Sequence, residues 1–188
     1  LIDGVEKDLD RYDITSAARA IQAFTDDLSN WYVRRGRDRY WGPEMTEDKK
    51  AAYATLYHVL VTLSEVIAPF VPFMAESIYQ NLVRGFFPDA PESVHLCTWP
   101  QADLSRVDRA LEERMAQVLN AVVLGRSCRN AANLKNRQPL SRMFLVSDRA
   151  DLPAELLALA ADELNVKQIE YVREVTDYVS YELKPQLK

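Results

Sequence analysis

Few residues in this sequence belong to the types that build covalent cross-links, metal sites or catalytic centres. Among the 188 residues there are only 2 cysteines, 2 histidines and 5 glycines. Cys97 and Cys128 stand far apart, with neither a CxxC motif nor a nearby pair of histidines. The sequence therefore predicts neither a zinc site nor a disulfide framework, and we expect both thiols to be reduced and packed, as in a cytoplasmic protein.

The familiar signatures of enzyme active sites are absent as well. The sequence contains no glycine-rich phosphate loop, no GxSxG motif and no HExxH motif. Adjacent carboxylates such as Asp26 and Asp27 diverge on a helix, so they cannot share a proton. We expect no self-contained active site, no metal and no cofactor in this chain.

Long hydrophobic runs are missing too. The longest apolar stretch, VIAPFVPFMA at 66–75, is too short and too often interrupted by proline to cross a bilayer. Leu1 begins no signal peptide. We expect a soluble, cytoplasmic protein with no membrane partner.

The net charge of −5 argues against a general nucleic-acid coat protein, but the charge is unevenly distributed. No aspartate or glutamate occurs between Glu113 and Asp148, a span that holds several arginines and a lysine. A second concentration of arginine lies in NWYVRRGRDRYW at 30–41. Two basic patches therefore interrupt an acidic chain.

Apolar residues recur at the three-and-four spacing of helices through the first 134 residues. The spacing predicts helices over 1–11, 14–40, 47–68 and 74–83, and a long one from 103 or 105 to 134. Gly42-Pro43 ends the second of these, because proline cannot continue the helical hydrogen bonds. Such helices are expected to pack as a bundle.

After Pro139 the pattern changes. Strands are predicted by short apolar runs at 143–146 and 166–172 and by the alternation of apolar and polar residues in YVSYELKP at 178–185. The amphipathic segment at 152–164 predicts a helix. We expect a mainly α protein: a helical bundle over 1–137 and a small α+β subdomain over 138–188, in the order strand, helix, strand, strand.

The second basic patch has a regular geometry. Arg126, Arg129, Asn130 and Asn133 are spaced i, i+3, i+4, i+7 and form one stripe, which we expect to face away from the apolar seam. Lys135, Asn136, Arg137 and Gln138 extend it past the helix end. Arginine interspersed with amide side chains suits phosphate, ribose and base-edge contacts, whereas a plain solvated face mixes both signs of charge.

The first patch admits more structural explanations. Arg34 lies one helical turn from Asp38, and Arg35 continues an apolar stripe through Trp31, which predicts a core position for both Trp31 and Arg35. Arg37, Arg39 and the aromatic residues at the helix end, Tyr40 and Trp41, remain for solvent or an RNA partner.

Five segments together resemble one family. They are DDLSNWYVRRGRDRYW at 26–41, APFVPFMAESIYQNL at 68–82, ESVHLCTWP at 92–100, GRSCRNAANLKNRQPLSRM at 125–143 and ELNVKQIEYV at 163–172. In this order and at these separations they resemble the tRNA-binding region of isoleucyl-tRNA synthetases, and the match covers nearly the whole chain. The HIGH and KMSKS signatures of the catalytic domain and the editing insertion are absent.

The resemblance implies a helical anticodon-binding domain that grips the anticodon stem and loop of isoleucine tRNA. The fragment itself would be no enzyme. Catalytic and editing domains of an ATP-dependent ligase, which uses ATP and Mg, would lie elsewhere in the parent chain. The expected RNA contacts are, first, Arg126, Arg129, Asn133, Lys135 and Arg137, and second, Arg34, Arg37, Arg39 and Trp41.

Three alternatives stay open at this point. The chain could be the equivalent domain of a sister class I synthetase for valine, leucine or methionine. It could be a structural helical module whose arginines form ion pairs within the protein. An independent enzyme would need a cleft with perturbed titratable groups.

Overall fold

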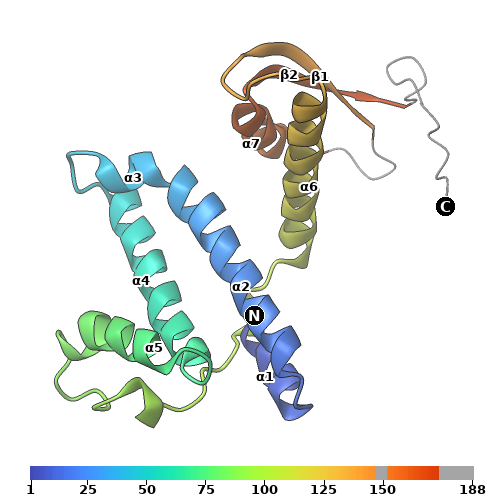
Figure 1. Ribbon diagram of the computed structural model, residues 1–188. Helices are drawn as coiled ribbons and strands as arrows, with labels where there is room; N and C mark the ends of the chain where they lie inside the picture. Colours follow the sequence, from blue (N-terminus) through green and yellow to red (C-terminus); the bar gives the residue numbers. More distant parts are fainter. Residues whose placement is uncertain (147–151, 174–188) are drawn as a thin grey trace. The chain divides into compact units, whose positions relative to one another are not determined.

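A computed structural model describes residues 1–146 and 152–173 (Figure 1). The chain divides into two compact units, Leu1–Leu104 and Ser105–Lys188. The division falls earlier than the predicted boundary between residues 137 and 138. The reason is that α6 (Arg109–Ala131) packs against α7 (Ala154–Leu164) and so belongs to the same unit as the strands.

The first unit is helical, and the helices expected over 1–11, 47–68 and 74–83 are confirmed. The elements of this unit are α1 (Ile2–Asp10), α2 (Ile14–Asp27), the π-helix η1 (Leu28–Val33), α3 (Arg37–Trp41), α4 (Glu47–Ile67), α5 (Pro72–Tyr79), the π-helix η2 (Gln80–Arg84) and the short 3₁₀ turn η3 (Val94–Leu96). A further 3₁₀ turn, η4 (Leu104–Arg106), begins at its last residue. The side chains of Asp13 and Thr46 cap α2 and α4 by accepting hydrogen bonds from Ser16 N and Lys49 N. Within the described residues no helix combines the length and hydropathy that a bilayer span requires.

The expected continuous helix over 14–40 is interrupted. Its middle forms η1, and a turn at Gly36 separates that π-helix from the short α3. A Cβ atom at Gly36 would lie 2.9 Å from the Tyr40 ring and 2.9 Å from the Tyr32 carbonyl oxygen. Glycine therefore allows Tyr40 to fold back against the backbone of its own helix.

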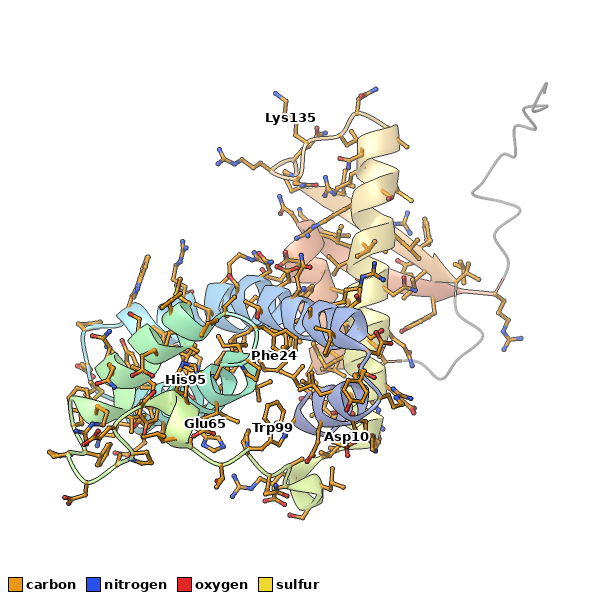
Figure 2. The ribbon with its side chains drawn as sticks, turned by 60° about the horizontal axis from the view of Figure 1, so that its bottom comes forward. Asp10, Phe24, Glu65, His95, Trp99 and Lys135 are labelled. Carbon is orange, nitrogen blue, oxygen red and sulfur yellow. The ribbon has the colours of Figure 1, made fainter. Side chains whose placement is uncertain are left out.

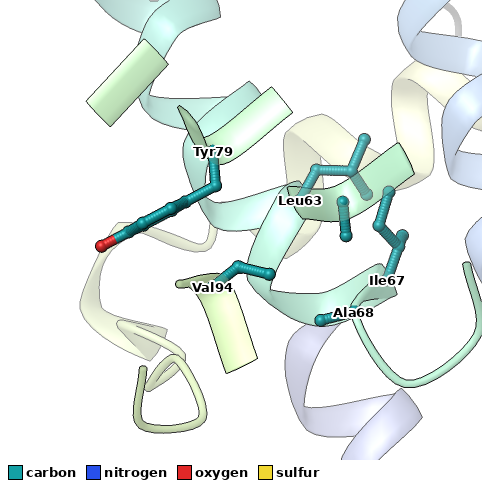
Figure 3. Packing of buried hydrophobic residues seen from close by; sticks show 6 residues of the cluster. Leu63, Ile67, Ala68, Tyr79 and Val94 are labelled. Atoms are coloured by element: carbon teal, nitrogen blue, oxygen red, sulfur yellow. The ribbon is translucent and has the colours of Figure 1, made fainter. Parts of the chain in front are cut away.

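Two apolar clusters hold the first unit together. In the larger one, Leu63 and Ile67 of α4 meet Tyr79 of α5 and Val94 of η3 (Figure 3). Side chains of α2, among them Phe24, pack against this cluster. In the second cluster Val5, Ala17 and Val66 join α1, α2 and α4. The α2 to α4 portion of the chain is thereby fixed as one body.

The second unit contains a parallel β-α-β arrangement. Strands β1 (Leu140–Val146) and β2 (Val166–Val172) pair in parallel from Leu140↔Val166 to Val146↔Val172, and α7 connects them. The predicted strand at 143–146, helix at 152–164 and strand at 166–172 are confirmed, although β1 begins earlier than expected. The predicted strand at 178–185 lies outside the described residues.

Helix α6 begins later than the sequence predicted. The face that it buries also differs from the predicted one. Asp108 caps it by accepting a hydrogen bond from Leu111 N at 2.9 Å. Its buried residues are Val118, Ala121, Val122, Gly125 and Arg129, whereas Cys128 is exposed. The expectation that Cys128 is packed on the apolar seam is therefore wrong, and the seam passes through Arg129 instead.

Gly125 permits the close approach of α6 and α7. A Cβ atom there would lie 2.5 Å from Leu164 Cδ1, inside the buried interface. We expect Gly125→Ala to destabilise the second unit by up to about 2 kcal/mol, because overpacking costs about 1 to 3 kcal/mol and alanine returns about 1 kcal/mol of helix propensity. Urea unfolding followed by circular dichroism measures this.

The matched control is Gly4→Ala in α1, where an added Cβ meets nothing within 4 Å. That change should stabilise the first unit by about 0.5 to 1 kcal/mol. Its unfolding can be followed separately, because Trp31, Trp41 and Trp99 all lie in the first unit. Stabilisation by both substitutions would contradict the close packing of α6 on α7.

Candidate nucleic-acid interface

Helix α6 ends in a turn of residues 132–139, named here the basic turn because it carries Lys135 and Arg137. Asn133 adopts the left-handed conformation, with φ 52°. Leu134 N donates to Arg129 O at 2.8 Å, and Asn133 N donates to Asn130 O at 3.1 Å, which closes the helix end. Asparagine is the residue other than glycine that tolerates this conformation best. The role of Asn133 that the geometry supports is therefore to end the helix and start the turn.

Lys135 and Arg137 are the open cations of the basic turn. Both side chains are exposed, and neither forms an ion pair with another described residue. Gln138 N donates to Lys135 O at 3.0 Å and closes the turn. Figure 2 shows Lys135 standing out from the turn beyond α6. These two side chains are exposed and so available to a phosphate, and that they contact RNA stays a prediction.

Arg129 is not available in this way, so the expectation that it faces outward is wrong. Its side chain lies on the buried seam of α6, and the residue is 3% exposed. The guanidinium donates to the backbone carbonyls of Lys135, Gln138, Leu164 and Asn165 at 3.0, 3.0, 2.6 and 3.2 Å. The spacing 118, 122, 125, 129 along α6 is the sequence signal that could have found this, had Gly125 been counted as a buried position.

Arg126 is paired within the protein but remains partly exposed. It forms an ion pair with Glu163 of α7, whose side chain is only 4% exposed, whereas that of Arg126 is 43% exposed. Arg126 is thus neutralised even though no acidic residue occurs between Glu113 and Asp148. Its partner comes from the next helix along the chain.

The first patch contains a cation stacked on an exposed ring. The Arg37 guanidinium lies 4.7 Å from the centroid of the Trp41 ring, one helical turn away. Trp41 is 73% exposed, which confirms its predicted position toward solvent. Trp31 and Arg35 are half-buried. The pair of Arg37 and Trp41 offers a flat surface with a positive charge beside it.

The expectation that Tyr40 faces solvent is wrong. It is buried and meets the Tyr53 ring edge to face at 5.3 Å between centroids. Burial, followed by a hydrogen bond with Tyr32, raises the pKa of Tyr40 to about 12. Tyr40 therefore stays a neutral wall of the site at physiological pH.

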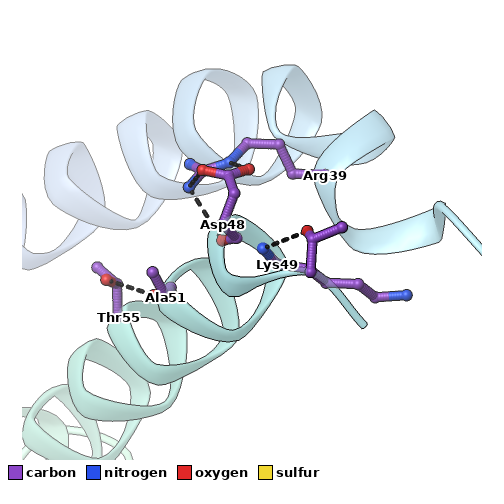
Figure 4. A network of polar contacts seen from close by, with 6 residues as sticks. Arg39, Asp48, Lys49, Ala51 and Thr55 are labelled. Carbon is purple, nitrogen blue, oxygen red and sulfur yellow. Dashed lines mark hydrogen bonds and ion pairs between the residues drawn. The ribbon is translucent and has the colours of Figure 1, made fainter. Parts of the chain in front are cut away.

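Arg39, expected to contact RNA, binds within the protein. Its Nε and Nη2 donate to the two carboxylate oxygens of Asp48 at 2.8 and 2.7 Å (Figure 4). These hydrogen bonds hold the pKa of the Asp48 carboxyl below its usual range. The bidentate geometry fixes the start of α4 against α3. Arg34 Nε donates to the Asn30 carbonyl at 2.8 Å, so this end of its guanidinium is also engaged.

A groove of about 420 Å³ runs beside these residues within the first unit. Its lining combines aromatic rings, an amide, a hydroxyl and two arginines. The lining residues are Ser29, Asn30, Val33, Arg34, Arg37, Tyr40, Trp41, Tyr53 and Leu56. The mixture of flat apolar walls and hydrogen-bonding groups suits an unstacked nucleobase.

In the parts of the chain that the structure describes, no cluster of three histidine, cysteine or acidic side chains could hold a metal ion. The titratable groups that line the groove are two arginines and two tyrosines, and burial raises the pKa of one of these, Tyr40. Its arrangement favours binding.

Comparison with known proteins decides the family. Residues 1–144 match the family described as "Anticodon-binding domain of tRNA ligase". The chain belongs to this family. The matched region includes the groove, the whole of α6 and the basic turn.

Individual relatives carry a more specific name. The isoleucine-tRNA ligase of Clostridium novyi is 56% identical over 187 residues, which cover 100% of this chain and 18% of that relative. The isoleucine-tRNA ligase of Thermus thermophilus is 44% identical over 192 residues, again 100% of this chain and 18% of the relative. That of Chlamydia trachomatis serovar D is 40% identical over 190 residues with the same coverage. The resemblance inferred from the five segments is confirmed, and this anticodon-binding domain spans about a fifth of the length of these relatives.

Asp48→Asn tests whether Arg39 is withheld from RNA in the anticodon-binding domain. We expect the variant to bind a tRNA transcript a few-fold more tightly, because Arg39 loses its bidentate partner and becomes free for a phosphate. Fluorescence anisotropy measures the change. Glu47→Gln is the matched control, since it removes the same charge one residue away and affects Lys50 instead. Equal effects of the two substitutions would mean that net charge alone matters.

Asn133 gives a second test, of its backbone role. We expect Asn133→Gly to preserve the stability of the second unit, because glycine has no Cβ to strain at φ 52°. Asn133→Ala should lower it by about 1 kcal/mol, because alanine keeps the Cβ and loses the polar group with which asparagine bonds locally in this conformation. Chemical denaturation measures both variants. If Asn133→Gly keeps its stability but loses affinity for a tRNA transcript, the amide side chain itself contacts RNA.

Proposed function

We propose that this domain holds the anticodon stem and loop of isoleucine tRNA, so that the distant acceptor end reaches the catalytic domain of an isoleucine-tRNA ligase. The observation that carries the proposal is the pair of open cations, Lys135 and Arg137, on a hydrogen-bonded turn. They lie in a chain that matches anticodon-binding domains over residues 1–144. The name of the relatives supports isoleucine as the amino acid.

In this proposal two kinds of contact bind the RNA. Lys135 and Arg137 neutralise phosphates, a contribution that depends on salt and not on sequence. The groove with Arg37 and Trp41 accepts an unstacked base, which is the usual target of sequence-specific RNA recognition. Binding energy thus comes mainly from the turn, and discrimination from the groove.

The remaining parts of the reaction belong to the parent chain. In this proposal the catalytic domain uses ATP and Mg for aminoacylation, and editing takes place in a further domain. This fragment is an RNA-binding part of a ligase that serves protein biosynthesis in the cytoplasm, and it needs no cofactor of its own.

The rival explanation is a structural module without RNA contact, which the ion pairs within the protein would support. The pairs of Arg126 with Glu163 and of Arg39 with Asp48 are what such a module would contain. Lys135 and Arg137 have no such partner among the described residues. The rival therefore accounts for two of the arginines and leaves the basic turn unexplained.

The test is a salt titration of binding to an isoleucine tRNA transcript, with a valine tRNA transcript as comparison. We expect Lys135→Gln/Arg137→Gln to weaken binding at least about tenfold, because charge-assisted contacts contribute about 1.5 to 3 kcal/mol each. The slope of log K against log salt should fall by about 1.5, since each phosphate contact contributes about 0.7 to 0.9.

The matched control removes the same charge from the other end of α6. Arg109 and Arg114 are exposed there, and Arg109→Gln/Arg114→Gln should leave the slope unchanged. A flat salt response of the unaltered chain, or equal losses in the two double variants, would rule out the basic turn as the phosphate site. Equal affinity for both transcripts would point to a sister ligase or to shape recognition alone.

A further inference from the structure

Arg129 is a buried cation whose bonds go to backbone carbonyls and, among the described residues, to no carboxylate. An isolated buried charge is strongly unfavourable unless its surroundings compensate it. Two of its acceptors, Leu164 O and Asn165 O, lie at the carboxyl end of α7, the negative pole of the helix dipole. The other two, Lys135 O and Gln138 O, belong to the basic turn.

Asn165 binds the two remaining carbonyls of the basic turn between Lys135 and Gln138. It ends α7 in the left-handed conformation, with φ 52°. Its side-chain Nδ2 donates to Arg137 O at 3.0 Å and to Asn136 O at 3.4 Å. The four successive carbonyls of residues 135–138 are therefore all bound by two side chains, the outer pair by Arg129 and the inner pair by Asn165.

This arrangement determines what the turn presents to solvent. Carbonyl oxygens repel a phosphate, and here all four are turned toward the protein and bound. The exposed side chains of Lys135 and Arg137 carry only donors. Since phosphate oxygens are acceptors only, the outer surface of the turn matches their chemistry.

We propose that Arg129 and Asn165 form a clamp that orders the basic turn before RNA arrives. Both are positioning residues: they act on RNA through Lys135 and Arg137 and do not touch it. The clamp rests on the proposed function of the turn and extends it. A turn that is already ordered loses little conformational entropy on binding, which improves affinity without any additional contact.

Asn165→Gly is the sharpest variant, because glycine keeps the left-handed backbone and removes only the two amide hydrogen bonds. Arg129→Lys is the second variant. It keeps the charge but cannot reach four carbonyls with the planar fork of arginine. Tyr12→Gly is the control, since Tyr12 is another left-handed residue, with φ 60°, in the first unit.

Two measurements are made on the 188-residue chain. Amide hydrogen exchange reports order in residues 134–138 and, for integrity of the fold, in the centre of α6. Anisotropy with an isoleucine tRNA transcript gives affinity and salt slope. The clamp predicts faster exchange in the turn alone and binding weaker by at least about tenfold, because fixing the backbone of one residue costs about a factor of ten. The salt slope should stay unchanged, since both cations remain.

A double-mutant cycle separates positioning from direct contact. In the Lys135→Gln/Arg137→Gln background, Asn165→Gly and Arg129→Lys should cause no further loss of affinity. Additive losses, or faster exchange in the turn with unchanged affinity, would overturn the clamp and leave the proposed function standing. If Lys135→Gln/Arg137→Gln binds RNA as well as the unaltered chain does, the proposed role of the turn fails, and the clamp fails with it. Either variant that keeps slow exchange in α6 is sufficient for the test.

Discussion

The second unit depends on one interaction, the insertion of the Arg129 guanidinium among four backbone carbonyls. It joins the end of α6, the basic turn and the end of α7, and Leu140 N donates to Asn165 O at 3.0 Å where β1 begins. Gly125 is part of the same constraint, because its missing Cβ lets Leu164 approach α6 closely enough for the Leu164 carbonyl to reach Arg129. The parallel sheet then follows, since β2 starts directly after that carboxyl end of α7.

The sequence predicted local features well because their causes are local. Helical spacing and the short apolar runs at 143–146 and 166–172 depend on residues a few positions apart. The partner of Arg126 and two of the four partners of Arg129 lie 35 to 37 residues away, in α7 and the residue after it. No periodicity within α6 indicates them. Arg39 and Asp48 are only 9 residues apart, but a chain reversal separates them, so helical spacing could not pair them either.

The number of arginines in a patch is therefore a poor measure of the charge available to RNA. Arg39 and Arg126 are neutralised by carboxylates, Arg129 is buried, and Arg37 lies over an aromatic ring. The open positive charge of the basic turn reduces to Lys135 and Arg137. In a chain of net charge −5, these two cations of the basic turn give little non-specific attraction for polyanions.

Both candidate surfaces apply the same physical rule, that a cation engaged by the protein fixes the position of neighbours that remain free. The Asp48 carboxylate holds Arg39, and with it the short α3 that carries the stacked Arg37 and Trp41. The carbonyls of residues 135 and 138 hold Arg129, and with it the turn that carries Lys135 and Arg137. A five-residue helix and an eight-residue turn are too short to be stable alone, so these bonds, together with the packing of Tyr40 on Tyr53 in the helix, favour one conformation. Arginine serves this purpose better than lysine, because its planar fork satisfies several acceptors with a single buried charge. In the proposed function, the arginines bound within the protein hold the exposed side chains in position for RNA.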